Sequence, residues 1–287
     1  MSFTQGLARL AASLVLLPLA GLLAACAGMD PAQRLQHADA LAAAARWQRH
    51  TVQAGAFALT VYRPATTTAA TFTVYLEGDG LAWLGAGTVS PDPTPVHPVA
   101  LHLALRHPHG AVAYLARPCQ FQGPALPAAC RSALWTGARY GREVVDSMNA
   151  ALDQLVQHSG ARRLVLVGYS GGGAVAALLA ARRTDVAMLL TVAANLDTDE
   201  WARLQHLSPL VASFNPADHA AQLARVPQQH WVGAEDDVVP PAVLAAYAAR
   251  FPAGARPPVA VVPGFGHACC WQAHWAGMVT PFLPPAD

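Results

Sequence analysis

A serine set among glycines, between an apolar run and an alanine-rich run, constrains the fold of this chain more than any other segment. Residues 164–167 are uncharged and partly β-branched, which is typical of a strand buried on both faces. Glycines flank Ser170, and residues 174–181 are strong helix formers. Arg182 and Arg183 follow, where positive charge favours a helix C-terminus. The pattern predicts a strand, then a turn so tight that only glycine fits beside the serine, then a helix.

The rest of the chain repeats this alternation of strand and helix. Apolar runs predict strands at residues 57–62, 72–76, 111–116, 163–169, 186–193, 229–233 and 259–262. Helical patterns lie between them, at residues 98–106, 141–158, 172–183, 240–251 and 269–280. This order predicts an α/β fold with a mostly parallel central sheet and helices on both faces. Residues 197–226 are less regular, and we expect a small cap there.

Composition excludes several classes of function. Hydrophobic residues make up 54% of the chain and charged residues 12%, so a large core is available. The net charge of +1 gives no reason to expect a nucleic-acid partner. The chain has no lysine, which excludes a phosphate-binding Walker loop, a Ser–Lys dyad and a pyridoxal phosphate site. We therefore expect no cofactor.

The first 25 residues are typical of a bacterial secretory signal peptide. Arg9 supplies positive charge, and the apolar run at 10–25 is short and interrupted for a membrane-spanning helix. The run ends in Leu-Ala-Ala-Cys at 23–26, which resembles the lipobox of bacterial lipoproteins. There the peptide is cleaved before the cysteine, which is then acylated. An uncleaved anchor and an ordinary secretory peptide remain alternatives.

The lipobox resemblance implies an organisation for the whole chain. Residues 1–25 are removed, Cys26 carries the lipid, and residues 26–55 form a tether whose alanine-rich part, 31–50, is a helix. Residues 56–287 form the folded domain. Because Ala27, and not Asp, follows the cysteine, the resemblance implies a lipid-anchored protein of the cell envelope at the outer membrane, facing the periplasm.

Four further cysteines could form disulfides in an oxidising compartment, in any of three pairings. Cys119 and Cys130 close a short Pro-rich loop and are the first choice, whereas the pairing of the adjacent Cys269 and Cys270 is not readable. No Cys-x₂-Cys spacing suggests zinc. We expect no metal site in the histidine-rich loop either, and assign its histidines to the solvated surface: His97, His102, His107 and His109.

Three segments, in order, resemble the α/β-hydrolase family. Residues 168–172 match the G-x-S-x-G pattern, in which a serine nucleophile sits on a sharp strand-to-helix turn. Residues 231–240 are similar to the family's strand-G-x-x-D-x-x-V-P segment. Residues 261–267 are similar to the closing strand and glycine-rich loop that present a histidine. The resemblance covers residues 57–282, most of the chain.

This resemblance implies a catalytic triad in the order Ser, acid, His. Ser170 would be the nucleophile, His267 its base and Asp236 the acid that orients the base. Asp237 and Asp197 remain alternatives for the acid. Asp236 could also simply cap the helix that follows it.

The resemblance also implies an oxyanion hole of two backbone N–H groups, from Gly171 and from Asp79 in the loop at 74–80. The chain departs from the family here, because Glu77 stands where histidine is usual. Two carboxylates beside a developing negative charge would oppose catalysis unless they turn away or pair with arginine. Arg117 is the expected partner.

The activity implied is hydrolysis of a small-molecule or lipid ester through an acyl-enzyme. A peptidase or a thioesterase would use the same triad, and a non-catalytic envelope lipoprotein could retain the same fold. The E-G-D-G loop at 77–80 and the R-P-C-Q segment at 117–120 resemble motifs of uncharacterised hydrolase-like lipoproteins of bacteria. This resemblance does not indicate a substrate. Aromatic candidates for the substrate pocket are Tyr169, Trp83, Phe265 and Trp135.

Overall fold

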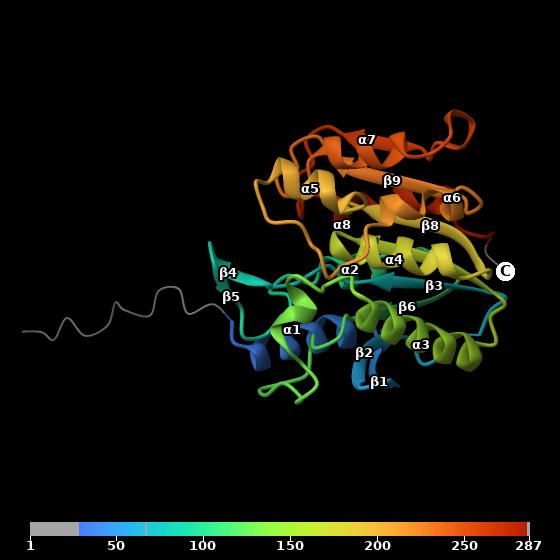
Figure 1. The fold of residues 1–287 in the computed structure, drawn as a ribbon. Coiled ribbons are helices and arrows are strands. Elements are labelled where there is room, and N and C mark those ends of the chain that lie inside the picture. Colours follow the sequence, from blue (N-terminus) through green and yellow to red (C-terminus); the bar gives the residue numbers. More distant parts are fainter. Residues whose placement is uncertain (1–28, 67, 286–287) are drawn as a thin grey trace, which may run out of the picture.

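An eight-stranded sheet forms the centre of the molecule (Figure 1). The computed structural model describes residues 29–66 and 68–285. The strand order is β1-β2-β6-β3-β7-β8-β9-β10; β2 pairs antiparallel with β1 and β6, and the remaining neighbours pair parallel. The strands are β1 (Gln48–Ala54), β2 (Phe57–Arg63), β3 (Thr71–Leu76), β6 (Ala111–Leu115), β7 (Arg163–Tyr169), β8 (Val186–Val192), β9 (Gln228–Gly233) and β10 (Val259–Val262).

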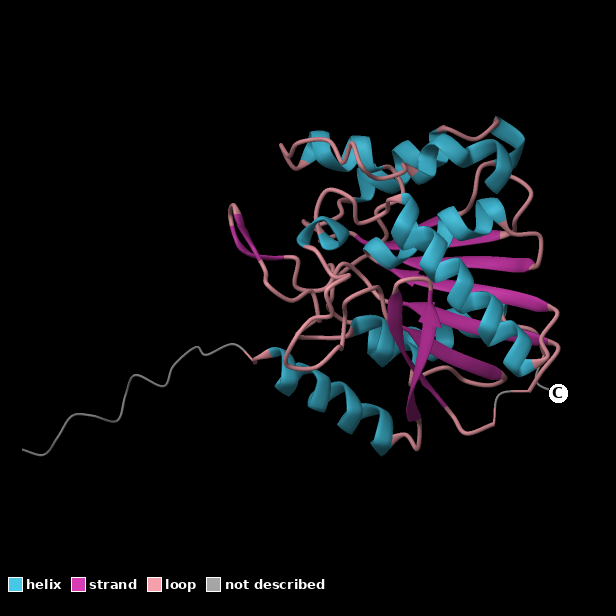
Figure 2. Ribbon diagram, turned by 60° about the horizontal axis from the view of Figure 1, so that its bottom comes forward, coloured by secondary structure: helices cyan, strands magenta, loops and turns pink. Residues whose placement is uncertain are grey.

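Helices cover both faces of the sheet (Figure 2). One core lies under α3 (Arg142–Ser159) and α4 (Gly171–Arg182), and the other lies under α1 (Pro31–Ala44), α2 (Val99–Ala104) and α8 (Trp271–Val279). The side chains of β3 alternate between the two cores, as a strand buried on both faces requires. The predicted α/β architecture is therefore confirmed.

The remaining elements are short. They are the strands β4 (Trp83–Gly85) and β5 (Thr88–Val89), the helices α5 (Thr198–Leu204), α6 (Ala220–Leu223) and α7 (Pro241–Ala249), and the 3₁₀ turns η1 (Ser132–Trp135), η2 (Pro216–His219), η3 (Ala253–Ala255) and η4 (Thr280–Phe282). The hairpin β4–β5 is a sheet of its own, and neither it nor β1 was expected. All seven predicted strands are present, and their ends lie within one residue of the predicted ends. The ends of the five helices predicted between the strands lie within two residues of the predicted ends.

The predicted tether is wrong for residues 31–54, because they pack as part of the domain. Ala38 and Ala42 of α1 are buried in the core shared with α2 and α8. The helix ends at Ala44, and β1 pairs with β2 along its whole length, so a boundary at residue 56 would separate two paired strands. The domain therefore begins at α1.

Some expectations concern segments outside or at the margin of this domain. Cys26 and the signal peptide at 1–25 lie outside the described residues. None of the described helices combines the length and the hydrophobicity needed to cross a bilayer. The segment 197–226, where a cap is predicted, holds α5, η2 and α6 joined by loops.

Candidate active site

The serine turn has the geometry that its sequence predicts. Ser170 joins β7 to α4 with φ 52° and ψ −125°, a positive φ that costs a non-glycine residue free energy. A Cβ on Gly172 would lie 2.3 Å from the carbonyl oxygen of Leu76. On Gly168 it would lie 2.4 Å from the Cα of Gly173. Only glycine permits these backbone approaches.

Three side chains from three loops meet at the carboxyl edge of the sheet. The Oγ of Ser170 lies 3.0 Å from the Nε2 of His267, in the loop after β10. The Nδ1 of the same ring lies 2.9 and 3.0 Å from the two carboxylate oxygens of Asp236, after β9. Asp236 is buried, and its Oδ1 also accepts hydrogen bonds from the N–H groups of Val238 and Val239. This is the nucleophile–base–acid geometry of a Ser-His-Asp triad.

The two alternative acids have other positions. Asp197 caps α5 by accepting from the N–H of Glu200, and its other oxygen lies 3.5 Å from the Nε of Arg250. Asp237 is exposed, beside the buried Asp236. Asp236 alone of the three contacts His267 through its side chain among the described residues.

The loop that follows β3 lies against the serine turn. A Cβ on Gly78 would lie 3.2 Å from the Cβ of Ser170. The side chain of Glu77 is buried and points away from the serine toward α2: it accepts from the N–H groups of Gly78 and Ala100 and from the hydroxyl of Tyr114. Burial raises the pKa of Glu77 to about 7.

Asp79 is neutralised by two arginines. Its carboxylate lies 2.9 Å from Arg117, the partner expected from the sequence, and 2.8 Å from Arg139. The hydroxyl of Tyr140 donates to the same carboxylate at 3.0 Å. Burial alone would raise the pKa of Asp79, but Arg139 and Arg117 hold it below its ordinary value. Neither carboxylate of the loop would therefore repel an oxyanion at the serine: Glu77 points away from it, and Asp79 is paired with arginines.

Sequence reasoning missed Arg139 and Tyr140. They precede α3, and no local motif marks them, although a buried aspartate needs counter-charges. A Cβ on Gly171 would lie 2.0 Å from the Oδ1 of Asp79, so the paired carboxylate packs directly against the first residue of α4. Gly171 and Asp79, the predicted oxyanion donors, are thus neighbours.

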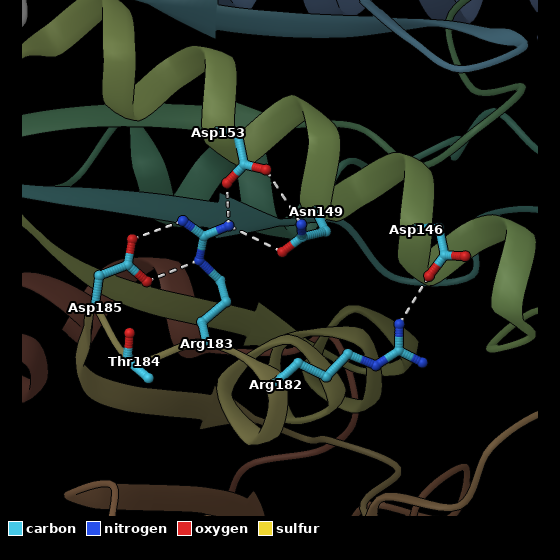
Figure 3. Close-up of a pocket in the computed structure, with 7 residues that line it drawn as sticks. All are labelled: Asp146, Asn149, Asp153, Arg182, Arg183, Thr184 and Asp185. Carbon is cyan, nitrogen blue, oxygen red and sulfur yellow. Dashed lines mark hydrogen bonds and ion pairs between the residues drawn. The ribbon is translucent and has the colours of Figure 1, made fainter.

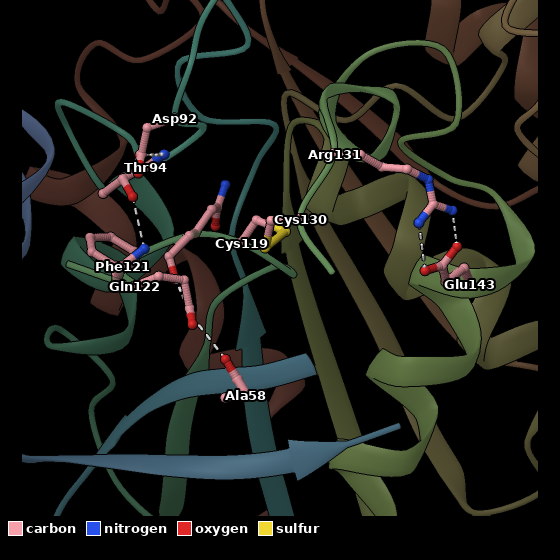
Figure 4. Close-up of a disulfide and its surroundings, with 10 residues drawn as sticks. Ala58, Asp92, Thr94, Cys119, Phe121, Gln122, Cys130, Arg131 and Glu143 are labelled. Carbon is pink, nitrogen blue, oxygen red and sulfur yellow. Dashed lines mark hydrogen bonds and ion pairs between the residues drawn. A yellow bond between two sulfur atoms is a disulfide. The ribbon is translucent and has the colours of Figure 1, made fainter. Parts of the chain in front are cut away.

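The segment 117–120 and its disulfide support the loop that follows β3. The side-chain amide of Gln120 donates to the carbonyl of Gly78 at 2.9 Å, and its oxygen accepts from the N–H of Arg117. The predicted disulfide between Cys119 and Cys130 is present (Figure 4). It ties the R-P-C-Q segment to the loop that leads to Arg139. Cys269 and Cys270 are joined to each other in the structure.

A cavity of about 940 Å³ opens at the serine. Tyr169 and Trp83 line it, as predicted. Phe265 does not: its ring packs against Trp271 with centroids 4.7 Å apart. Trp135 is likewise outside the lining, since it is buried and its indole N–H donates to the carbonyl of Ser90. Both were wrong as pocket residues because their rings turn into the protein.

Asn195 is a further polar residue of this cavity that sequence reasoning missed. It lines the cavity together with Ser170 and His267, and is 3% exposed. Its Oδ1 is buried without a hydrogen-bond partner among the described residues. A buried polar atom without a partner is uncommon in folded proteins, which makes this amide a candidate binding group of the cavity.

A second hollow lies at the opposite, amino edge of the sheet, where α4 ends and β8 begins (Figure 3). Its side chains satisfy one another: Arg183 contacts Asp153, Asp185 and Asn149, and Arg182 contacts Asp146. No three His, Cys, Asp or Glu residues are placed to hold a metal ion in the described part of the chain.

Comparison with known proteins identifies the fold. The family model of the alpha/beta hydrolase fold matches residues 122–210, which include Ser170. Among curated proteins, no significant sequence match is found. The family match, together with the sheet and the serine turn, is consistent with a member of the α/β-hydrolase superfamily.

Solved structures agree. An esterase of Pyrococcus furiosus superposes with a TM-score of 0.58 at 13% identity, over 83% of this chain and 89% of that one. An α/β serine hydrolase homologue of Coxiella burnetii gives 0.55 at 17% identity, over 83% and 97%. A lidless α/β serine hydrolase of Xanthomonas campestris gives 0.54 at 13% identity, over 84% and 97%. At these identities the likeness establishes a shared fold.

Proposed function

We propose that this chain, which has the α/β-hydrolase fold, is a serine hydrolase that cleaves carboxylic esters. One observation carries the proposal: the Oγ of Ser170 lies 3.0 Å from a ring nitrogen of His267, whose other nitrogen is held by the buried Asp236. A serine hydroxyl is a weak nucleophile by itself, and this contact is what activates it. The cavity beside it offers space for a substrate.

The mechanism follows from the positions of these groups. His267 accepts the proton of Ser170 as the hydroxyl attacks the ester carbonyl, and Asp236 stabilises the imidazolium that forms. The backbone N–H groups of Gly171 and Asp79 are the proposed donors to the oxyanion. His267 then gives its proton to the departing alcohol. Water attacks the acyl-enzyme in the same way and releases the acid.

We favour an apolar ester as the substrate because the lining of the cavity is largely apolar. Its lining includes Leu81, Leu210 and Val239, and Asn195 and Ser208 are among its polar side chains. A lipid or small apolar ester fits such a lining. A peptidase or thioesterase remains the alternative with the same triad. A non-catalytic envelope lipoprotein is less well supported, because it would have no need of three correctly spaced catalytic groups.

We further propose that residues 1–25 are a signal peptide, that Cys26 carries a lipid anchor, and that the protein faces the periplasm from the outer membrane. The Leu-Ala-Ala-Cys sequence and Ala27 support this location. The disulfide between Cys119 and Cys130 suits an oxidising compartment.

A fluorophosphonate probe tests the activity, because it reacts with an activated serine. We expect the wild-type protein to be labelled and Ser170→Ala and His267→Ala to lose labelling while they retain their thermal unfolding transitions. Ser208→Ala, which alters another serine of the same cavity, is the matched control and should keep full labelling. Absence of labelling in folded wild-type protein would refute the proposal and favour a scaffold. An ester chain-length series, run beside peptide and thioester substrates, decides between the alternatives.

A further inference from the structure

Exposed apolar side chains gather at the mouth of the cavity. Seven large hydrophobic residues are exposed among the described residues, and six of them lie on or next to segments that line this cavity: Trp83, Leu84, Val89, Leu207, Val211 and Val238. Three of the six line it directly. We call these six residues the rim. Of the seven exposed residues in the described part of the chain, Val261 on the edge strand β10 is the one that lies elsewhere.

Three separate segments build the rim. The hairpin β4–β5 carries Trp83, Leu84 and Val89, with Trp83 paired to Val89 across its strands. The loop after α5 carries Leu207 and Val211, a residue that is 93% exposed, and the loop before α7 carries Val238. Apolar surface concentrated in this way is unusual for a face that stays in water, and it marks a contact with an apolar partner.

The described chain begins on the same side of the molecule. Arg34, in the first turn of α1, donates hydrogen bonds to the carbonyls of Asp92 and Thr94, and the next residues, 95–97, line the cavity. In both ribbon views the start of α1 and the β4–β5 hairpin extend beyond the same edge of the sheet (Figures 1 and 2). The N-terminal end of α1 therefore lies beside the mouth.

The sequence before α1 identifies the occupant of this face. Asp30 is only four positions after Cys26, and an extended chain spans at most about 3.6 Å per residue. A lipid on Cys26 would therefore keep the start of α1 within roughly 15 Å of a bilayer. A domain held so closely, with an apolar rim beside its point of attachment, meets the bilayer through that rim.

We propose that the rim inserts into the surface of a phospholipid bilayer and that the cavity draws its ester substrate directly from the lipid phase. This inference rests on the proposed function and on its lipid anchor, and it adds the source and class of the substrate: an acyl ester dissolved in the membrane. Trp83 suits this position, because an indole prefers the interface between headgroups and acyl chains.

Fluorescence of Trp83 tests the contact in the full lipid-modified chain, reconstituted in vesicles of phosphatidylethanolamine and phosphatidylglycerol with a brominated phospholipid as quencher. Trp83 is the most exposed of the seven tryptophans, since Trp47 is half-buried and the other five are buried. We expect the brominated lipid to quench part of the emission, and Trp83→Phe to lose most of that quenching. Emission unaffected by the brominated lipid would overturn the proposal.

Hydrolysis provides a second measurement. Leu84 and Val211 belong to the rim but do not line the cavity. The double variant Leu84→Ser/Val211→Ser should hydrolyse a long-chain ester in vesicles at least about tenfold more slowly, because each apolar side chain removed weakens insertion by about that factor. Its rate on a soluble short-chain ester should stay unchanged. Val261→Ser, an exposed valine outside the rim, is the matched control and should leave both rates unchanged.

Failure of this proposal and failure of the proposed function are distinguishable. Normal fluorophosphonate labelling with no quenching of Trp83 would refute membrane contact alone. Quenching without any labelling or hydrolysis would refute the enzyme and retain the contact. If the protein in detergent sediments as a dimer and the rim substitutions make it monomeric, the rim binds a second copy, and the bilayer proposal is wrong.

Discussion

Replacing Glu77 by glutamine should make the protein more stable at neutral and alkaline pH, although it removes a charge from the loop beside the active site. The carboxyl is buried, and burial raises its pKa from 4.5 to about 7. In the folded protein it is therefore protonated up to about pH 7, whereas in the unfolded chain it ionises near pH 4.5. The unfolded state releases its proton first, so stability falls as pH rises between these two values.

The magnitude follows from the size of this pKa difference. Each pKa unit corresponds to 1.36 kcal/mol, so the rise from 4.5 to about 7 corresponds to roughly 3 kcal/mol of lost stability above pH 7. Glutamine keeps the side-chain oxygen that accepts from the N–H groups of Gly78 and Ala100, and it cannot ionise. The variant should therefore escape this loss.

Urea unfolding followed by tryptophan fluorescence measures the effect. The difference in free energy of unfolding, Glu77→Gln minus wild type, should grow by roughly 2–3 kcal/mol between about pH 5 and pH 8. Glu235→Gln changes an exposed carboxyl and should vary by less than about 0.5 kcal/mol over that range. A difference that stays constant with pH, or that shrinks as pH rises, would show that the buried carboxyl is ionised throughout and would refute the reasoning.

Three further substitutions probe the packing around the serine. Arg117→Met should lower the free energy of unfolding by roughly 2 kcal/mol. This is less than the roughly 3–5 kcal/mol typical of a broken buried ion pair, because Asp79 keeps its second arginine. The variant should also lower kcat more than it raises KM. Gly172→Ala should cost about 3 kcal/mol, since its Cβ meets a backbone oxygen at 2.3 Å, whereas Gly254→Ala has open space and should be nearly neutral. Asn195→Leu should leave Tm unchanged or raised, because it removes a buried oxygen without a partner, yet lower kcat/KM about tenfold.

Each of these three substitution predictions would be contradicted by a specific result. Unchanged kinetics in Arg117→Met would show that the Asp79 loop is held without that pair. Equal stability of the two alanine variants would mean that α4 shifts to make room for a methyl group. A wild-type kcat/KM in Asn195→Leu would show that the amide does not touch substrate.

The sequence was sufficient to predict features that depend on a local motif, or on a sheet topology that brings distant segments to one edge. Gly168 is required by contacts within the serine turn itself, and the G-x-S-x-G pattern marks the turn without a structure. His267 and Asp236 follow β10 and β9, and the carboxyl ends of parallel strands share one edge of a sheet. For that reason the two residues named by the resemblance meet Ser170 in the structure.

Other features depend on side-chain direction, which a single sequence does not specify. Phe265 is two residues from His267, but its ring turns toward Trp271 and away from the cavity. β1 was missed because its residues are mostly polar and exposed, so it shows little apolar alternation. Arg139 reaches Asp79 from sixty residues further along the chain, and only the folded protein brings the two together.

The backbone conformation of Ser170 has a consequence for the stability of the fold. A positive φ at a residue with a side chain costs on the order of 1–3 kcal/mol, and glycine would relieve that cost without disturbing the surrounding turn. The folded state therefore carries a strained backbone at the residue whose hydroxyl contacts His267, and the packing around the turn must offset that cost.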